Sequence, residues 1–284
     1  MRLAFDMASY VWTGMRAGRD KEHGYEVVHN EKTVYVNSAQ HGYDNAVGMM
    51  IKTMTRHGLT PHQCLLVFEG MHSKKRRQAI EASYKGNRDG DKPPEESAEY
   101  HKACALVEAA WKAVGAISLS QPFVEGDDVL GYLAHHAESP LVIATYDGDL
   151  LALQGTNPQG VEVLVQVDDK VGFNKYGDFP FNHITLYKSL VGDINDNIKG
   201  CPGFGKKSWD VFHLTYGDEG LDYLHSLLVK GTFDELNAQR DEDKLIRLIC
   251  DQAPQTLRSY QLAKIHHEWV NTRNTALDIR PGMC

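Results

Sequence analysis

The chain has 284 residues, of which 42% are hydrophobic, and a formal net charge of −8 at pH 7. This length allows one large domain, or two smaller ones, with a sizeable hydrophobic core. The acidic balance argues against nonspecific nucleic-acid binding by the whole surface, although it leaves room for a local basic patch.

The five cysteines are odd in number and include no CxxC pair. We therefore expect free thiols in a reducing cytosol rather than disulfides or a structural zinc site. The N-terminus lacks a signal-peptide profile, and no apolar run reaches the length of a membrane span. These features predict a cytoplasmic protein without a membrane partner.

Strand-like and helix-like segments alternate through the first three-quarters of the chain. Apolar runs predict strands at residues 3–5, 64–68, 141–146 and 161–167, and a hairpin at residues 25–36. Helical periodicity predicts helices at residues 44–57, 95–114 and 127–137. Such alternation is typical of an α/β domain with a mainly parallel central sheet flanked by helices.

The pattern becomes mostly helical after about residue 183. Helices are expected at residues 185–191, 206–216, 220–230, 233–236, 241–250 and 259–267. We therefore predict an α/β domain over residues 1–183 and a helical region over residues 184–284.

Acidic residues follow apolar runs in five separate groups. Ligands of parallel sheets bind at the carboxyl ends of the strands, so acids delivered to that edge crowd together. Such crowding is costly unless divalent cations neutralise the carboxylates, which predicts a polynuclear metal site. The nine candidates are Asp6, Glu69, Glu125, Asp127, Asp128, Asp147, Asp149, Asp193 and Asp196.

Two of these groups also have simpler interpretations. Glu125, Asp127 and Asp128 precede a predicted helix, where one or two acids would serve as caps, but three would repel each other. The pair Asp147-Gly148 is a common turn signal. However, Asp147 and Asp149 follow a buried strand and face the same way, so they can share one ion.

The segment from Asp193 to Lys207 allows three interpretations. It fails as an EF-hand because Ile198 and Phe204 stand where Gly and Glu are required. As a phosphate loop it has Lys207 in place of the magnesium-binding Ser or Thr. The third interpretation is two helices joined by a glycine-rich loop, residues 200–205, that grips a nucleic-acid backbone without reading its sequence.

Residues 72–92 form a basic segment, with seven Lys or Arg residues against three acidic ones. A solvated charged helix would explain this composition. Tyr84 beside Lys85 favours a nucleic-acid contact, because an aromatic ring flanked by cations can stack on a base and hold its phosphate. The histidines, including the pairs His135–His136 and His266–His267, are expected to be structural or surface residues without a metal-binding role.

Four motifs in order, SYKGNRD, VEGDDVLGYLA, ATYDGDLLAL and VGDINDNIKGCPGFGKK, resemble the 5′-nuclease family. This family includes flap endonucleases, bacteriophage 5′–3′ exonucleases and the 5′-nuclease domain of bacterial DNA polymerase I. The resemblance implies a PIN-like α/β fold with a helical arch at about residues 72–95 and a helix–three-turn–helix motif in the helical region. It also implies a free-standing enzyme of phage or bacterial type.

The resemblance assigns the acids to two cation sites that hold Mg²⁺ or Mn²⁺. The first cluster comprises Asp6, Glu69, Glu125, Asp127 and Asp128, and the second comprises Asp147, Asp149, Asp193 and Asp196. Asp128 and Asp149 are then catalytic together with Lys85, which matches the family lysine that contacts the scissile phosphate.

The resemblance also implies DNA contacts. Tyr84 matches an aromatic residue that stacks on a terminal base, Arg76 or Arg77 matches a family arginine, and Arg88 belongs to the same segment. The helix–three-turn–helix motif would grip duplex DNA, with a K⁺ ion held by the carbonyls of residues 200–205. Its contact residues are Gly203, Gly205, Lys206 and Lys207.

The expected function is hydrolysis of DNA at a free 5′ end or a 5′ flap by a monomeric two-metal nuclease, located in the host cytoplasm if it is phage-encoded. The alternatives are a related PIN-type ribonuclease and an inactive DNA-structure-binding protein. Two departures from the family pattern concern Glu69, where Asp is usual, and Ala82 and Ser83, where a proline usually precedes the Tyr-Lys pair.

Overall fold

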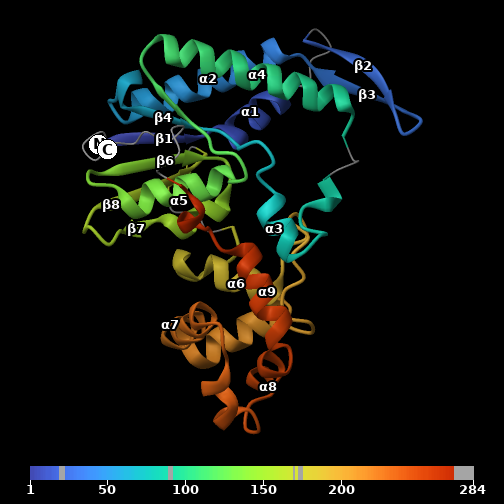
Figure 1. Ribbon diagram of the computed structural model, residues 1–284, viewed down its shortest axis with the longest axis vertical. Coiled ribbons are helices and arrows are strands. Elements are labelled where there is room, and N and C mark those ends of the chain that lie inside the picture. Colours follow the sequence, from blue (N-terminus) through green and yellow to red (C-terminus); the bar gives the residue numbers. More distant parts are fainter. Residues whose placement is uncertain (19–22, 89–91, 169, 172–174, 272–284) are drawn as a thin grey trace. The chain divides into compact units, whose positions relative to one another are not determined.

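The computed structural model describes residues 1–18, 23–88, 92–168, 170–171 and 175–271. The chain forms two compact units, each built from more than one segment (Figure 1). The sheet unit comprises Met1–Ser73, Gly90–Phe173 and Ile265–Cys284, and the helical unit comprises Lys74–Asp89 and Asn174–Lys264.

The sheet unit is built on a seven-stranded sheet. Its parallel strands lie in the order β5 (Ile117–Leu119), β4 (Cys64–Val67), β1 (Arg2–Asp6), β6 (Leu141–Thr145) and β8 (Glu162–Val167). The short strands β7 (Gly155–Thr156) and β9 (Lys170–Val171) pair with β8 in antiparallel orientation. The predicted mainly parallel α/β sheet is therefore confirmed, and its carboxyl ends meet at one edge.

Helices cover both faces of this sheet. Figure 1 shows α1 (Met7–Arg16), α2 (Ala39–Arg56) and α4 (Pro94–Ala113) on one face and α5 (Gly126–His136) on the other. The first face buries a core that includes Phe5, Leu66 and Trp111. Helices α1 and α2 cross closely at Gly14, where a Cβ atom would lie 2.7 Å from the carbonyl oxygen of Gly42.

The predicted hairpin is confirmed as β2 (Gly24–His29) and β3 (Lys32–Asn37). Its turn residues Asn30 and Glu31 have φ angles of 49° and 62°, as a tight two-residue hairpin turn requires. Helix α1 and strand β5 were not predicted. Helix α1 begins directly after β1 with no linker, and β5 has only three residues, too few to show a strand pattern.

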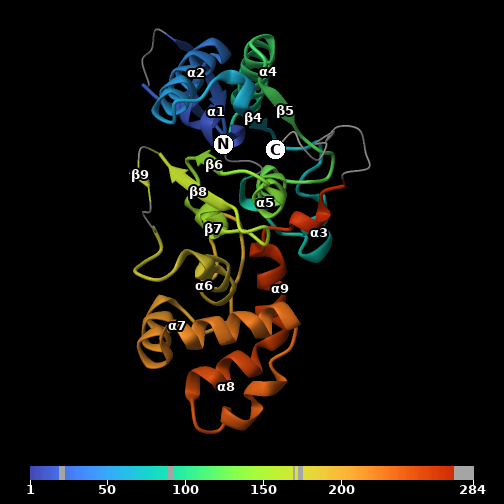
Figure 2. The same ribbon diagram turned by 90° about the vertical axis from the view of Figure 1, so that its left-hand side faces the viewer.

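The helical unit contains α3 (Lys75–Ile80), α6 (Ile184–Val191), α7 (Lys206–Lys230), α8 (Lys244–Asp251) and α9 (Ala253–Ala263). Figure 2 shows the last four of these helices grouped together. Helix α7 is kinked at Gly217, so its two halves agree with the two helices predicted at residues 206–216 and 220–230. Trp209 is buried on α7 against Phe179 and Tyr187, with ring centroids 4.9 and 5.1 Å apart.

The basic segment differs from the expected arch. Its described part forms only the six-residue helix α3 and the 3-10 turn η2 (Gly86–Arg88). It belongs to the helical unit rather than to the predicted domain of residues 1–183. The reason is hydrophobic burial, since Ile80 and Tyr84 pack with Ile198 and Leu262.

The predicted glycine-rich connection joins α6 to α7, with Gly200 and Gly203 at φ angles of 70° and 87°. Its description as a helix–three-turn–helix motif stays a prediction. The described cysteines Cys64, Cys104, Cys201 and Cys250 are free thiols, and Cys284 lies outside the described residues. None of the described helices combines the length and apolar composition needed to cross a membrane.

Candidate active site

Asp6 lies at the carboxyl end of the central strand β1 and also caps helix α1. Its Oδ1 accepts a hydrogen bond from the Ser9 amide at 3.2 Å, and its Oδ2 accepts one from the Thr145 hydroxyl at 2.7 Å. Burial raises the pKa of Asp6, and these hydrogen bonds offset only part of the effect. A nearby cation would lower that pKa again, which is the behaviour expected of a metal ligand.

Glu69 and Glu125 are brought together at the ends of β4 and β5. The Gly70 amide donates to the Val124 carbonyl at 3.2 Å, which joins the two connections. The Glu69 carboxylate points to the start of α5, because a Cβ atom on Gly126 would lie 3.6 Å from its Oε1. Glu125 is the N-cap residue of α5 and is buried. Glutamate at position 69 therefore reaches the start of α5 despite the departure from the family pattern.

Asp127 and Asp128 occupy the first turn of α5. Asp128 is completely buried, and its Oδ1 accepts a hydrogen bond from the His266 amide at 2.7 Å. One carboxylate oxygen of Asp128 thus holds the segment that follows residue 264. This structural role could not be predicted from the sequence, because the two residues lie 138 positions apart.

Asp147 and Asp149 follow β6, as predicted. The Asp149 amide donates to Asp147 Oδ1 at 3.0 Å, so Asp147 caps the 3-10 turn η3 (Gly148–Leu153). The Thr145 hydroxyl accepts from the Asp147 amide at 2.8 Å while it donates to Asp6. Thr145 therefore links acids of the two predicted clusters. Thr145 was not among the predicted site residues, although its position at the end of a buried strand places it at the same edge of the sheet as the acids.

Asp193 and Asp196 belong to the helical unit, in the loop after α6. The backbones of Asp193 and Ile198 bond each other in both directions at 2.8 Å, which closes this loop. Lys188, buried on α6, places its Nζ 2.8 Å from Asp193 and 3.7 Å from Asp196. Arg88 also pairs with Asp196. Lys188 was not among the predicted site residues, although a lysine inside the apolar helix ITLYKSLV indicates a buried charge that needs an acidic partner.

Lys85 lies beside the same loop in the helical unit. Its backbone has a φ of 52°, and its amide donates to the Asp196 carbonyl at 3.0 Å. Two further hydrogen bonds join the segment to the loop: Asn87 to the Ile194 carbonyl and Asn197 to the Ser83 carbonyl, both 2.8 Å. The predicted scissile-phosphate lysine is therefore held next to Asp193 and Asp196.

Three of the predicted DNA-binding residues, Arg77, Tyr84 and Lys85, are buried. Arg77 donates to the carbonyls of Leu262 and Lys264 at 3.1 and 2.7 Å, so its guanidinium fastens α3 to the end of α9. The ring of Tyr84 is only 2% exposed. A base can stack on that ring only if the segment rearranges. Of the two candidate arginines, Arg76 is the one that is partly exposed.

The glycine-rich loop ends at the exposed start of α7. Gly203, Gly205, Lys206 and Lys207 are all exposed, and the amide groups of the first helical turn have no acceptor within the helix. Lys206 pairs with Asp210 at 3.5 Å, an exposed pair of small energetic value. These residues together offer positive charge and backbone donors to a phosphate group.

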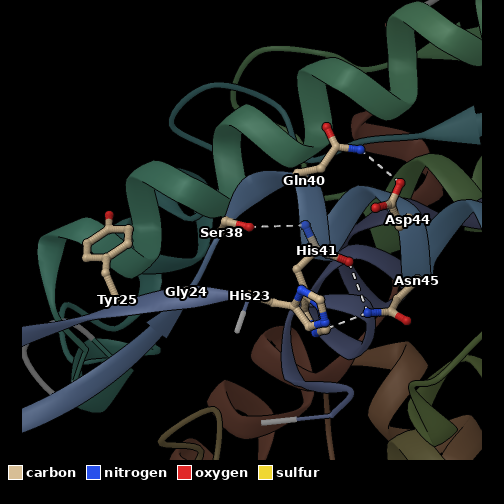
Figure 3. Close-up of a pocket in the computed structure, with 8 residues that line it drawn as sticks. All are labelled: His23, Gly24, Tyr25, Ser38, Gln40, His41, Asp44 and Asn45. Carbon is tan, nitrogen blue, oxygen red and sulfur yellow. Dashed lines mark hydrogen bonds between the residues drawn. The ribbon is translucent and has the colours of Figure 1, made fainter. Parts of the chain in front are cut away.

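The described residues also line a separate polar pocket of about 550 Å³ at the base of the hairpin (Figure 3). Figure 3 shows His41 and Asn45 turned toward one another from the start of α2. The side-chain amide of Asn45 donates to the backbone carbonyl of His41 at 3.0 Å. None of the predicted site residues lines this pocket, so the candidate active site is the acidic edge of the sheet.

The carboxylates of that edge fit a hard divalent cation. Seven of the nine predicted acids lie in the sheet unit, at the carboxyl ends of β1, β4, β5 and β6, and two lie in the helical unit. Carboxylate oxygens are the ligands that Mg²⁺ and Mn²⁺ prefer. Burial raises the pKa of Asp6, and a bound cation would oppose that effect.

Comparison with known proteins identifies relatives of this arrangement. The family model described as the 5′-3′ exonuclease, N-terminal resolvase-like domain, matches residues 25–177. A 5′-3′ exonuclease of Halalkalibacterium halodurans is 26% identical over 213 residues, which cover 72% of this chain and 65% of the relative. DNA polymerase I of Pseudomonas aeruginosa is 32% identical over 194 residues, covering 66% of this chain and 20% of the relative.

The fold is also similar to that of a bacteriophage T5 flap endonuclease solved with DNA and metal ions. The TM-score is 0.60 at 16% identity, and the match covers 93% of this chain and 89% of that one. The chain spans 16% of the length of the DNA polymerase I sequences of Mycobacterium leprae and Rhizobium leguminosarum.

Proposed function

Since the chain belongs to the 5′-3′ exonuclease family, we propose that it hydrolyses phosphodiester bonds of DNA at free 5′ ends or at 5′ flaps. The observation that carries this proposal is the gathering of carboxylates at one edge of the parallel sheet. Asp6, Glu69, Glu125 and Asp147 end or follow four adjacent strands there. We propose that a water molecule activated by a bound cation is the attacking group.

The proposed cofactors are two divalent cations, Mg²⁺ or Mn²⁺. The first would be held by Asp6, Glu69, Glu125, Asp127 and the second oxygen of Asp128. The second would be held by Asp147 and Asp149 together with Asp193 and Asp196. Bound there, such cations lower the pKa of an attacking water and stabilise the leaving 3′ oxygen.

The basic residues of the helical unit would position the substrate. Lys85 is proposed to neutralise the charge that develops on the scissile phosphate. Arg76 and Arg88 would contact the 5′ strand. Arg88 already pairs with Asp196, so it must exchange that carboxylate for a phosphate when DNA and a cation bind.

The loop between α6 and α7 is proposed to hold duplex DNA. Gly203 and Gly205 allow the backbone to approach a phosphate closely, and Lys206 and Lys207 add charge. A K⁺ ion held by the carbonyls of residues 200–205 would complete a helix–three-turn–helix motif. We propose that the protein works as a monomer in the cytoplasm.

A duplex with a 5′ flap, labelled at either end, tests the function. With Mg²⁺ we expect short 5′-labelled products, and EDTA should abolish them. Asp149→Asn should lose turnover and still bind the flap. Product length separates exonuclease from flap-endonuclease preference. Release from the 3′ end first, or faster cleavage of an RNA flap than of DNA, would contradict the proposal and favour the ribonuclease alternative.

A further inference from the structure

Three histidines meet at the carboxyl end of α5, where the sequence pattern indicated only structural or surface residues. His135 and His136 are the last two residues of α5, and His267 begins the 3-10 turn η6 (His267–Trp269). One ring nitrogen of each lies within 4.8 Å of the other two. The rings of His135 and His267 stack with centroids 4.1 Å apart.

Packing within the sheet unit holds this meeting point in place. The Asp128 carboxylate accepts from the His266 amide at 2.7 Å, one residue before His267. Gly131 leaves room for Ile265, since a Cβ atom there would lie 2.4 Å from the Ile265 Cγ2. The buried His266 ring stacks on Trp269 at 3.7 Å. Residues 265–269 therefore lie along α5. The contacts of Ile265 and His266 with α5 hold His267 next to His135.

The cluster is distinct from the acidic edge of the sheet. Asp127 is in the first turn of α5 and His135 is eight residues further on, a rise of about 12 Å along the helix. The carboxyl end of a helix also favours a cation, through its dipole. Three imidazoles suit Zn²⁺, Co²⁺ or Ni²⁺, whereas the carboxylates suit Mg²⁺.

Binding one ion requires the rings to reorient. Ligand nitrogens around tetrahedral zinc lie about 3.3 Å apart, because each Zn–N bond is about 2.0–2.1 Å long. The three nitrogens lie within 4.8 Å of one another, and the His135 and His267 rings, now stacked at an interplanar angle of 14°, must turn out of the stack to point at a common ion.

We propose that His135, His136 and His267 bind a Zn²⁺ ion, which fastens the segment after residue 264 onto α5. Three protein ligands leave the fourth position to water. The site supports the fold, and it takes no part in the proposed hydrolysis. The proposal therefore stands or falls independently of the nuclease activity.

The test is titration of the full chain with Zn²⁺ in a calorimeter, in excess Mg²⁺ to occupy the carboxylates. We compare wild type with His267→Gln and use His101→Gln, on the exposed surface of α4, as the matched control. Loss of a residue that only supports a metal ligand typically weakens metal binding about 10- to 100-fold. His267→Gln removes a ligand itself, so it should weaken zinc binding by more than that. His101→Gln should bind like wild type.

A second readout uses Co²⁺, whose visible absorption reports nitrogen ligands. The absorption band should appear in wild type and disappear in His135→Gln, which also keeps the test open if His267→Gln fails to fold. Equal zinc affinity in wild type and both histidine variants would overturn the proposal. So would a zinc signal that survives in these variants and is lost in Asp149→Asn, because the ion would then sit on the carboxylates.

Discussion

The ammonium group of Lys188 lies 2.8 Å from the carboxylate of Asp193, and both side chains are largely buried, at 5% and 12% exposure. A lysine from the middle of α6 thus supplies the counter-charge for an acid that we assign to a cation site. The same ammonium lies 3.7 Å from Asp196. The helical unit therefore folds with these acids already compensated, before any cation binds.

Replacement of Lys188 by methionine should destabilise the protein. The change keeps the length of the side chain but leaves Asp193 buried without its partner, which costs about 3 kcal/mol. Urea unfolding without metal measures the loss. Lys230→Met is the control, because Lys230 and Glu235 form an exposed pair whose removal should lower the free energy of unfolding far less. Equal losses in the two variants would contradict the buried role of Lys188.

Thr145→Val should move the acid limb of the pH–activity profile to higher pH. The Thr145 hydroxyl donates to Asp6 and so opposes the effect of burial, which raises the pKa of Asp6. Without that hydroxyl the pKa of Asp6 rises further, and the carboxylate needed to hold a cation is lost at a higher pH. Half-maximal activity should also require more Mg²⁺.

Thr53→Val is the matched control for this shift. Thr53 is buried and bonds the Tyr10 hydroxyl at 3.0 Å, with no acid in that hydrogen bond. Each valine variant should lose about 1–3 kcal/mol of stability, since each leaves a buried polar group without its hydrogen-bond partner. Only Thr145→Val should change the pH profile. An identical acid limb in both variants would remove Asp6 from the proposed cation ligands.

Lys85→Met should lower turnover by about 100-fold or more while flap binding falls much less. Methionine preserves packing against the Tyr84 ring, whose centroid lies 5.1 Å from the Lys85 Nζ, and it removes only the charge. Single-turnover cleavage measures the effect. Lys75→Met, an exposed change on α3, should stay within about twofold of wild type. A similarly small effect of Lys85→Met would exclude the lysine from the site.

The two adjacent arginines should separate stability from DNA binding. Arg77→Met removes the guanidinium that donates to the Leu262 and Lys264 carbonyls, so it should cost about 2 kcal/mol in unfolding experiments. Arg76→Met should leave stability within about 0.5 kcal/mol and weaken flap binding. The reverse pattern would identify Arg77 as the arginine that contacts DNA.

Lys206→Gln combined with Lys207→Gln should weaken binding of duplex DNA of any sequence. Each lost phosphate contact should reduce the slope of log affinity against log salt by about 0.9. Fluorescence anisotropy at several salt concentrations measures that slope. Lys230→Gln, at the opposite end of α7, serves as the control. An unchanged slope in the double variant would place duplex binding elsewhere.

Much of the fold could be predicted because its signals are local. Buried parallel strands appear as apolar runs, and α2, α4 and α5 show helical periodicity, so these elements could be predicted. Most of their predicted ends lie within a few residues of the observed ones. The hairpin was visible because Asn30 and Glu31 interrupt two alternating segments. Helix α1 was not predicted because Asp6 both ends strand β1 and caps the helix, so no turn or loop residues mark the boundary.

The acids at the strand ends could be identified from the sequence alone, because strand direction places them at one edge whatever the distant contacts are. What each side chain does at that edge depends on the folded structure. Asp128 holds His266, Thr145 joins Asp6 to Asp147, Lys188 compensates Asp193, and Arg77 is a structural residue. These partners are mostly far apart along the chain, and their roles depend on burial and hydrogen-bond geometry. Residue type and local spacing contain no record of either.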